Sequence, residues 1–150
     1  MRGERVSKEV RVDAQADTLP AGPIGDPGLY RTPAKPLYHA WGAFGSPLVI
    51  AELALAERVA RSAGISAPDA RKTIEPLVRR TIDNYFAHSA AAAFSGPLVR
   101  GDLNTVKRHL EQLSRVPGAR EVYLALARTA LKNLPVKRRR ELARLLHGQA

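Results

Sequence analysis

The chain contains no cysteine, few aromatic residues and no long hydrophobic run. Without cysteine it has no disulfide framework, no thiolate metal site and no cysteine nucleophile. Aromatic residues make up only 5% of the 150 residues, whereas Ala and Leu are abundant from Ala34 onward, which favours helices over a β-sandwich. The most apolar stretch, residues 48–55, is interrupted by Glu52 and is far too short to span a bilayer. Since no apolar segment follows the charged start, no signal peptide is expected, and we predict a cytoplasmic protein without a membrane partner.

The net charge of +10 lies entirely in residues 34–150, because residues 1–33 carry five basic and five acidic side chains. Much of the excess positive charge lies near the C-terminal end, where there is one acidic residue, Glu141, and there are six basic ones: Lys132, Lys137, Arg138, Arg139, Arg140 and Arg144. Such a surface attracts ligands that bear phosphate, nucleotides and nucleic acid alike. The sign of the charge does not choose among them.

The length fits one domain preceded by an irregular segment. Residues 1–33 are expected to form an irregular or disordered lead-in, because prolines and glycines interrupt them too densely for a helix or a sheet. The domain is expected to occupy residues 34–150 and to be all-α, with about five helices.

The first two expected helices each contain an internal proline, Pro47 and Pro76. The first runs over residues 36–63 and is expected to kink where Gly42, Gly45 and Pro47 interrupt it. The second begins at Ser66, an N-cap followed three residues later by Asp69. Its helical spacing directs five apolar residues inward: Ile74, Leu77, Val78, Ile82 and Phe86.

Three further helices complete the expected bundle. The third begins at the N-cap Asp102 and stops at Pro117, the fourth covers residues 119–134, and the fifth is the basic segment at the end. The third is expected to bury Val106, Leu110 and Leu113. The fourth carries Val122, Leu126 and Ala130 on one face, and the fifth contains Leu142, Leu145 and Leu146.

Three segments together carry a family resemblance. They are Lys35-Pro-Leu-Tyr-His-Ala, Pro76-Leu-Val, and Phe94-Ser-Gly-Pro-Leu-Val-Arg-Gly-Asp followed by His109. Over about residues 35–134 the chain resembles the family called domain of unknown function 2520. The resemblance implies the helical C-terminal half of Rossmann-like NADP oxidoreductases, with a bundle similar to the C-terminal domains of the 6-phosphogluconate dehydrogenase group.

The sequence departs from that family in the nucleotide-binding half. A dinucleotide fingerprint needs a strand, a G-x-G-x-x-G turn and a helix within a βαβ unit of roughly 30 residues. Residues 22–28 are rich in glycine, but their prolines forbid the helix whose N-terminus would hold the pyrophosphate. NADP or NAD is therefore implied by the resemblance only, neither is expected to bind this chain alone, and a Rossmann-domain subunit is the expected partner.

Lys35, His39 and Ser46 are spaced so that they lie on roughly one side of a helix. An ammonium, an imidazole and a hydroxyl on one stripe can bind a substrate carboxylate and move a proton as hydride is delivered nearby. The resemblance makes His39 the proton-transfer candidate and Lys35 its electrostatic partner. Ser46 is a candidate substrate-binding residue from its place on the stripe, and it departs from the family, which commonly has Asn at this position. The alternative is a solvated lysine beside a hydrogen-bonded helix histidine.

Arg100 and His109 are the other candidate substrate-binding residues. Arg100 stands between a Gly-Pro turn and an N-cap, where a guanidinium can clamp a carboxylate or phosphate. The alternative is a structural ion pair with Asp69 or Asp102. His109 matches a histidine of the family's third helix, and the alternative is a packing residue. No H-E-x-x-H pattern or carboxylate cluster suggests a metal.

Two other function classes stay open. A free-standing helical module would retain only the homodimer interface that helical halves of this superfamily often form. Nucleic-acid binding through residues 137–140 is disfavoured, because no interleaved aromatic residues, helix-turn-helix signature or RNA-binding motif accompanies the charge. The sequence does not indicate the small-molecule substrate.

Overall fold

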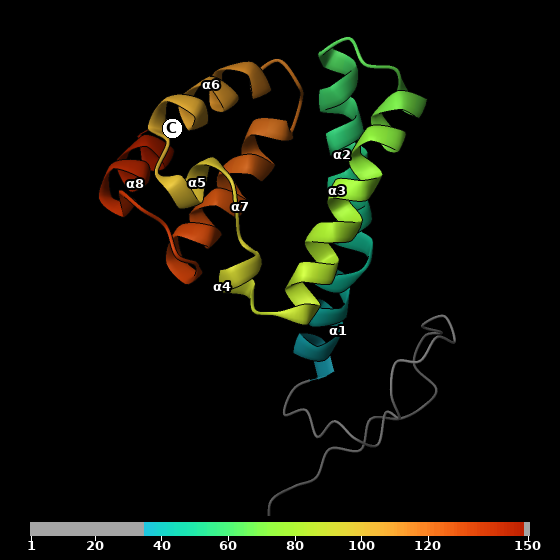
Figure 1. The fold of residues 1–150 in the computed structure, drawn as a ribbon, viewed down its shortest axis with the longest axis horizontal. Helices are drawn as coiled ribbons and strands as arrows, with labels where there is room; N and C mark the ends of the chain where they lie inside the picture. Colours follow the sequence, from blue (N-terminus) through green and yellow to red (C-terminus); the bar gives the residue numbers. More distant parts are fainter. Residues whose placement is uncertain (1–34, 149–150) are drawn as a thin grey trace, which may run out of the picture. The chain divides into compact units, whose positions relative to one another are not determined.

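The computed structural model describes residues 35–148. All regular structure in this range is helical, which confirms the all-α expectation (Figure 1). The helices are α1 (Lys35–Gly45), α2 (Pro47–Ser62), α3 (Ala67–Ala87), α4 (Ala90–Ala93), α5 (Pro97–Arg100), α6 (Leu103–Leu113), α7 (Ala119–Asn133) and α8 (Arg139–His147). The chain divides into two units, Met1–Ala51 and Glu52–Ala150, within α2. The expected lead-in, residues 1–33, lies outside the described residues.

The expected first helix is present as α1 and α2, which meet at a turn at Ser46. Pro47 begins α2 and has no N–H to donate to the preceding turn. Ser46 N–H donates instead to the carbonyl of Ala43 at 3.4 Å. The predicted interruption is confirmed, and it places Ser46 between two helices rather than within one.

Local signals set the ends of α2 and α3. Gly64, at φ 86°, follows α2 in the left-handed region that favours glycine. Ser66 caps α3: its hydroxyl oxygen accepts from Asp69 N–H at 3.3 Å and the hydroxyl donates to the Asp69 carboxylate at 2.5 Å. This reciprocal pair confirms the predicted N-terminus.

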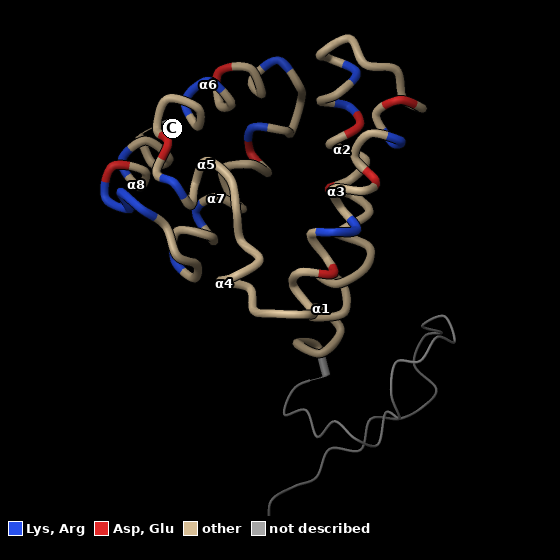
Figure 2. Tube along the Cα trace, in the orientation of Figure 1, with Lys and Arg blue, Asp and Glu red and all other residues tan. Residues whose placement is uncertain are grey.

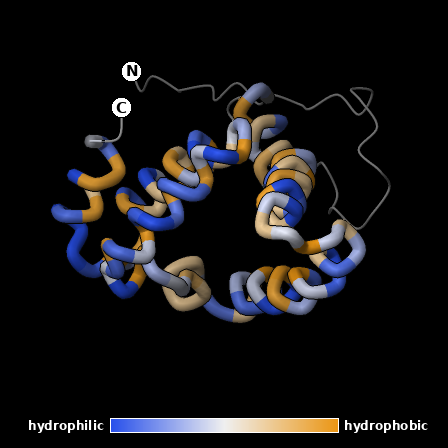
Figure 3. Tube along the Cα trace, turned by 90° about the horizontal axis from the view of Figure 1, so that it is seen from above, coloured by the Kyte–Doolittle hydropathy of each residue, from blue (hydrophilic) through white to orange (hydrophobic). Residues whose placement is uncertain are grey.

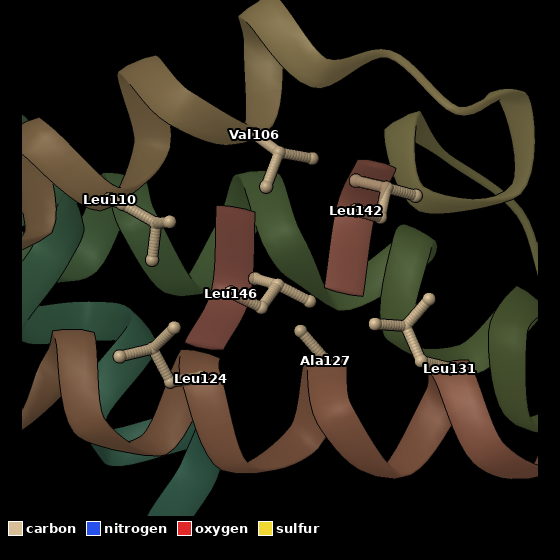
Figure 4. Packing of buried hydrophobic residues seen from close by; sticks show 7 residues of the cluster. All are labelled: Val106, Leu110, Leu124, Ala127, Leu131, Leu142 and Leu146. Carbon is tan, nitrogen blue, oxygen red and sulfur yellow. The ribbon is translucent and has the colours of Figure 1, made fainter. Parts of the chain in front are cut away.

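The hydrophobic core lies in the second unit, where α6, α7 and α8 meet (Figure 4). Its seven residues are Val106, Leu110, Leu124, Ala127, Leu131, Leu142 and Leu146. The predicted burial of Val106 and Leu110 on α6 is confirmed, whereas Leu113 is only half-buried. On α8, Leu142 and Leu146 are buried and Leu145 is half-buried.

The apolar face that the sequence indicates on α7 is mostly exposed. Val122 and Leu126 are 38% and 48% exposed, and only Ala130 of that predicted stripe is buried. The helix instead buries Leu124, Ala127 and Leu131. Both sets have helical spacing, and the set that faces α6 and α8 places two leucines in the core.

The inward face predicted for α3 was wrong for three of its five residues. Ile74 and Val78 are half-buried, but Leu77, Ile82 and Phe86 are 64%, 43% and 79% exposed. Nine residues separate Leu77 from Phe86, so at about 100° per residue they point in nearly opposite directions. Apolar residues therefore extend around about half of α3, more than a single neighbouring helix covers.

The pair α2–α3 is correspondingly thinly packed. Among the described residues α2 has no buried side chain, and α3 buries only Ala70. An ion pair joins the two helices, with Arg71 Nε 2.5 Å from Glu57 Oε1. The hydropathy colouring in Figure 3 shows apolar and polar residues alternating along the helices.

Candidate functional site

The first candidate residues lie on α1 and at its end. His39 is exposed, and its ring meets that of Tyr38 edge-on, with 5.9 Å between ring centroids. Lys35 is the first residue of α1, and its side chain lies outside the described part of the structure. Ser46 is exposed in the turn before α2. The imidazole and the hydroxyl are thus open to a ligand, but the helical spacing that grouped them ends before Ser46.

The Gly-Pro…Arg-Gly-Asp segment forms α5 and its two ends. Gly96, at φ 99°, precedes Pro97, which starts the helix, and Gly101, at φ 69°, ends it. Asp102 then caps α6, its carboxylate accepting from Thr105 N–H at 3.0 Å. This bond is the main reason why the pKa of Asp102 lies below its usual value, and the nearby Arg100 and Arg108 add smaller attractions. The predicted cap is confirmed.

Gly101 is required for a second reason, a close approach to the segment that leads into α8. A Cβ atom at Gly101 would lie 2.8 Å from the Lys137 carbonyl oxygen and 3.1 Å from the Arg138 Cβ. Lys137 N–H also donates to the Val99 carbonyl at 3.1 Å. Backbone conformation and packing therefore explain the two glycines, the proline and the aspartate of this motif.

Neither backbone conformation nor capping explains Arg100, which belongs to the same motif. Its side chain is exposed and forms no salt bridge with Asp69 or Asp102 in the described range. The Asp69 carboxylate is hydrogen-bonded to Ser66. The guanidinium is accordingly available to an anionic ligand.

His109 is on α6 and interacts with α7. Its Nδ1 lies 3.3 Å from the Tyr123 hydroxyl, and the two rings meet edge-on with centroids 5.8 Å apart. Burial raises the pKa of Tyr123. His109 thus has a packing partner, as the alternative reading required, while its side chain remains exposed.

The candidates fall into both units of the chain. His39 and Ser46 belong to the first unit, and Arg100 and His109 to the second. Their assembly into one site stays a prediction.

Sequence reasoning missed a hollow in the second unit, lined by Arg58, Arg61, Ser62, Val116 and Pro117. Its two sides are distant in the sequence and neither carries a recognisable motif, so no local signal could have found it.

Basic side chains gather on α8 and on the connection into it (Figure 2). The same helix buries Leu142 and Leu146 completely. The basic segment is therefore part of the folded core, and removing it would expose the apolar faces of α6 and α7.

A comparison with known protein families identifies the family of the chain. The family model described as Domain of unknown function (DUF2520) matches residues 21–130. The chain belongs to this family. The DUF2520 match covers α1 to α6 and most of α7, and α8 follows it. No curated protein and no solved structure matches the chain.

Two general features complete the description. Residues 35–148 contain no group of His, Asp and Glu side chains that could hold a metal ion. In the same range, every helix is too short or too polar to cross a bilayer.

Proposed function

We propose that this DUF2520 chain is the substrate-side, dimer-forming helical half of an NAD(P)-dependent oxidoreductase, whose nucleotide is held by a separate Rossmann domain. The observation that carries this proposal is the exposed apolar surface of α3. This surface supports a role in association, and the candidate residues would supply groups for binding and proton transfer.

The dimer-forming role follows from the apolar residues that α3 leaves uncovered. Leu77, Ile82, Tyr85 and Phe86 are 43–79% exposed on this one helix. Exposed apolar side chains spread around about half of one helix form more apolar surface than a monomer usually leaves open, and such surface is typical of association sites. A second copy is the expected occupant, because most soluble oligomers are symmetric homodimers whose interface is the same patch on both subunits.

A similar apolar stripe runs along the first unit. Leu37, Trp41, Phe44 and Leu48 follow one another at spacings of four, three and four residues, and each is at least 48% exposed. This spacing puts Leu37, Trp41 and Phe44 on one side of α1, whereas Leu48 lies beyond the turn at Ser46, on α2. The stripe supports association by the first unit as well.

The substrate-side role rests on His39 and Arg100. His39 presents an exposed imidazole without a hydrogen bond to any described residue. Arg100 presents a guanidinium suited to a carboxylate or phosphate. With Lys35, Ser46 and His109, these groups would bind the substrate and exchange a proton while the cofactor, NADP or NAD, supplies the hydride.

The test of the oxidoreductase role is reconstitution. The full chain is mixed with the Rossmann domain of an oxidoreductase that carries a DUF2520 domain. The mixture is expected to oxidise NADPH in the presence of a small carbonyl substrate, tested across a panel of keto acids. His39→Ala should abolish the activity, whereas Gln112→Ala, a change at an exposed residue of α6, should leave it intact. Activity that survives in His39→Ala removes His39 from the mechanism.

Isothermal titration calorimetry of the chain alone tests whether the nucleotide is held by the Rossmann domain and not by this chain. NADPH is expected to produce no saturable heat, since these residues offer no dinucleotide fingerprint. Micromolar binding would show that the chain holds the nucleotide itself.

The second candidate, a helical module that only dimerises, is favoured by the same exposed surface of α3. It predicts a stable dimer together with no NADPH oxidation in any mixture. NADPH oxidation in the reconstitution therefore separates the two candidates.

A further inference from the structure

We propose that the hollow between the end of α2 and the loop from α6 to α7 binds a small oxyanion, a phosphate or carboxylate group attached to an apolar molecule. The hollow has a volume of about 300 Å³ and lies wholly within the second unit. Its lining is two arginines, a serine, a valine and a proline, without an acidic side chain.

Arg58 is held in place by the loop. Its Nη2 donates to the Pro117 carbonyl oxygen at 3.2 Å. A guanidinium has five N–H groups in a fixed plane, so this bond orients Arg58 and leaves further donors for a ligand. Orientation before binding lowers the entropy lost when an anion is bound.

Arg61 supplies the second guanidinium. It forms no hydrogen bond or salt bridge with a residue in the described range, and its attraction to Glu57 acts only through space. Glu57 itself is bound by Arg71, whose hydrogen bond is the main reason why the pKa of Glu57 is lowered. The charge of Glu57 is thus neutralised by another arginine.

The other residues that line the hollow favour an anion with an apolar part. Val116 is only 6% exposed and, with Pro117, provides an apolar surface. The Ser62 hydroxyl already donates to the Arg58 carbonyl at 3.1 Å, so the arginines must supply the side-chain donors. Two cations beside an apolar wall suit an amphipathic anion.

The experiment is a titration of the full chain at constant ionic strength, followed by NMR of the Val116 amide and the arginine Nε–H groups. The probes are inorganic phosphate, phenyl phosphate and benzoate, with sodium chloride as reference. We expect saturable shifts in the millimolar range, tighter for phenyl phosphate or benzoate than for inorganic phosphate. Their ranking identifies the oxyanion as phosphate or carboxylate.

Three variants locate the binding. Arg61→Gln removes a charge without breaking a hydrogen bond and should weaken binding about tenfold or more. Arg58→Lys keeps the charge but loses the planar fork and should also weaken it. Arg140→Gln, the same charge change on α8, should bind as the unmodified chain does. Shifts that do not saturate with any probe, or equal weakening by Arg61→Gln and Arg140→Gln, would overturn the proposal.

Discussion

Replacing Leu142 by alanine tests whether α8 belongs to the fold. Leu142 is fully buried among residues of α6 and α7, although α8 lies beyond the part of the chain that the DUF2520 family matches. A domain that ended with the family match would lose nothing from a change in α8. The structure instead makes this leucine part of the only core among the described residues.

The magnitude follows from the atoms removed. Leu142→Ala deletes three carbon atoms, which at about 0.8 kcal/mol per buried methylene amounts to about 2.4 kcal/mol. The cavity left behind adds to this loss, because neighbouring elements relax only partly. The expected total is about 3–5 kcal/mol. Since small domains unfold with only about 5–15 kcal/mol, the variant should lie close to its limit of stability.

Urea unfolding followed by far-ultraviolet circular dichroism measures this loss. Leu126→Ala is the matched control, because the same atoms are removed from an α7 residue that is 48% exposed. The control should cost about 1 kcal/mol or less. Equal losses in the two variants would refute the packing of α8 against α6 and α7.

Three other predictions follow from single residues. Gly101→Ala should destabilise the domain by at least about 1–2 kcal/mol in thermal unfolding, since alanine is strained at φ 69° and its Cβ would meet the Lys137 carbonyl; an unchanged melting temperature would contradict this contact. Because the pKa of Asp102 is lowered in the folded state, its stabilisation is present above the pKa of the unfolded chain and is lost as the pH falls through the folded value. Asp102→Asn keeps the cap and should remove this part of the acid dependence, whereas an identical pH profile would argue against it. His39→Ala should leave the free energy of unfolding within about 0.5 kcal/mol, so that any loss of reconstituted activity reports on chemistry; a larger loss would make His39 structural.

Local signals predicted the helix ends well. Ser66 and Asp102 cap their helices as their sequence context indicates, and Gly64 ends α2. These features depend on a few neighbouring residues, whose hydrogen bonds and φ angles are fixed by residue type. The break at Ser46 followed from Pro47 for the same reason.

The direction in which a helix faces was harder to predict. On α7, the stripe through Val122 and Leu126 and the stripe through Leu124 and Leu131 have the same periodicity, and only the position of α6 and α8 selects between them. On α3, apolar residues surround half the helix, so a pattern alone could not say which would be covered.

The candidate site was predictable only in its individual residues. Sequence spacing grouped His39 with Ser46, but the bend before α2 interrupts that helix. Sequence reasoning explained Asp102 correctly and left Arg100 between two readings; its lack of an ion pair with Asp69 or Asp102 favours availability to a ligand. The hollow beside Arg58 required the structure, because residues 58–62 and 116–117 meet only after folding.

Sedimentation equilibrium of the full chain is the most direct measurement of the central claim, that the exposed apolar surface of α3 is an association site. The unmodified chain should show twice its monomer mass. Introducing Leu77→Lys and Phe86→Lys together should give a monomer with unchanged helical content, since both side chains are exposed, while Gln112→Lys on α6 should remain dimeric. A monomeric unmodified chain, or a dimer that tolerates both lysines on α3, would contradict the account.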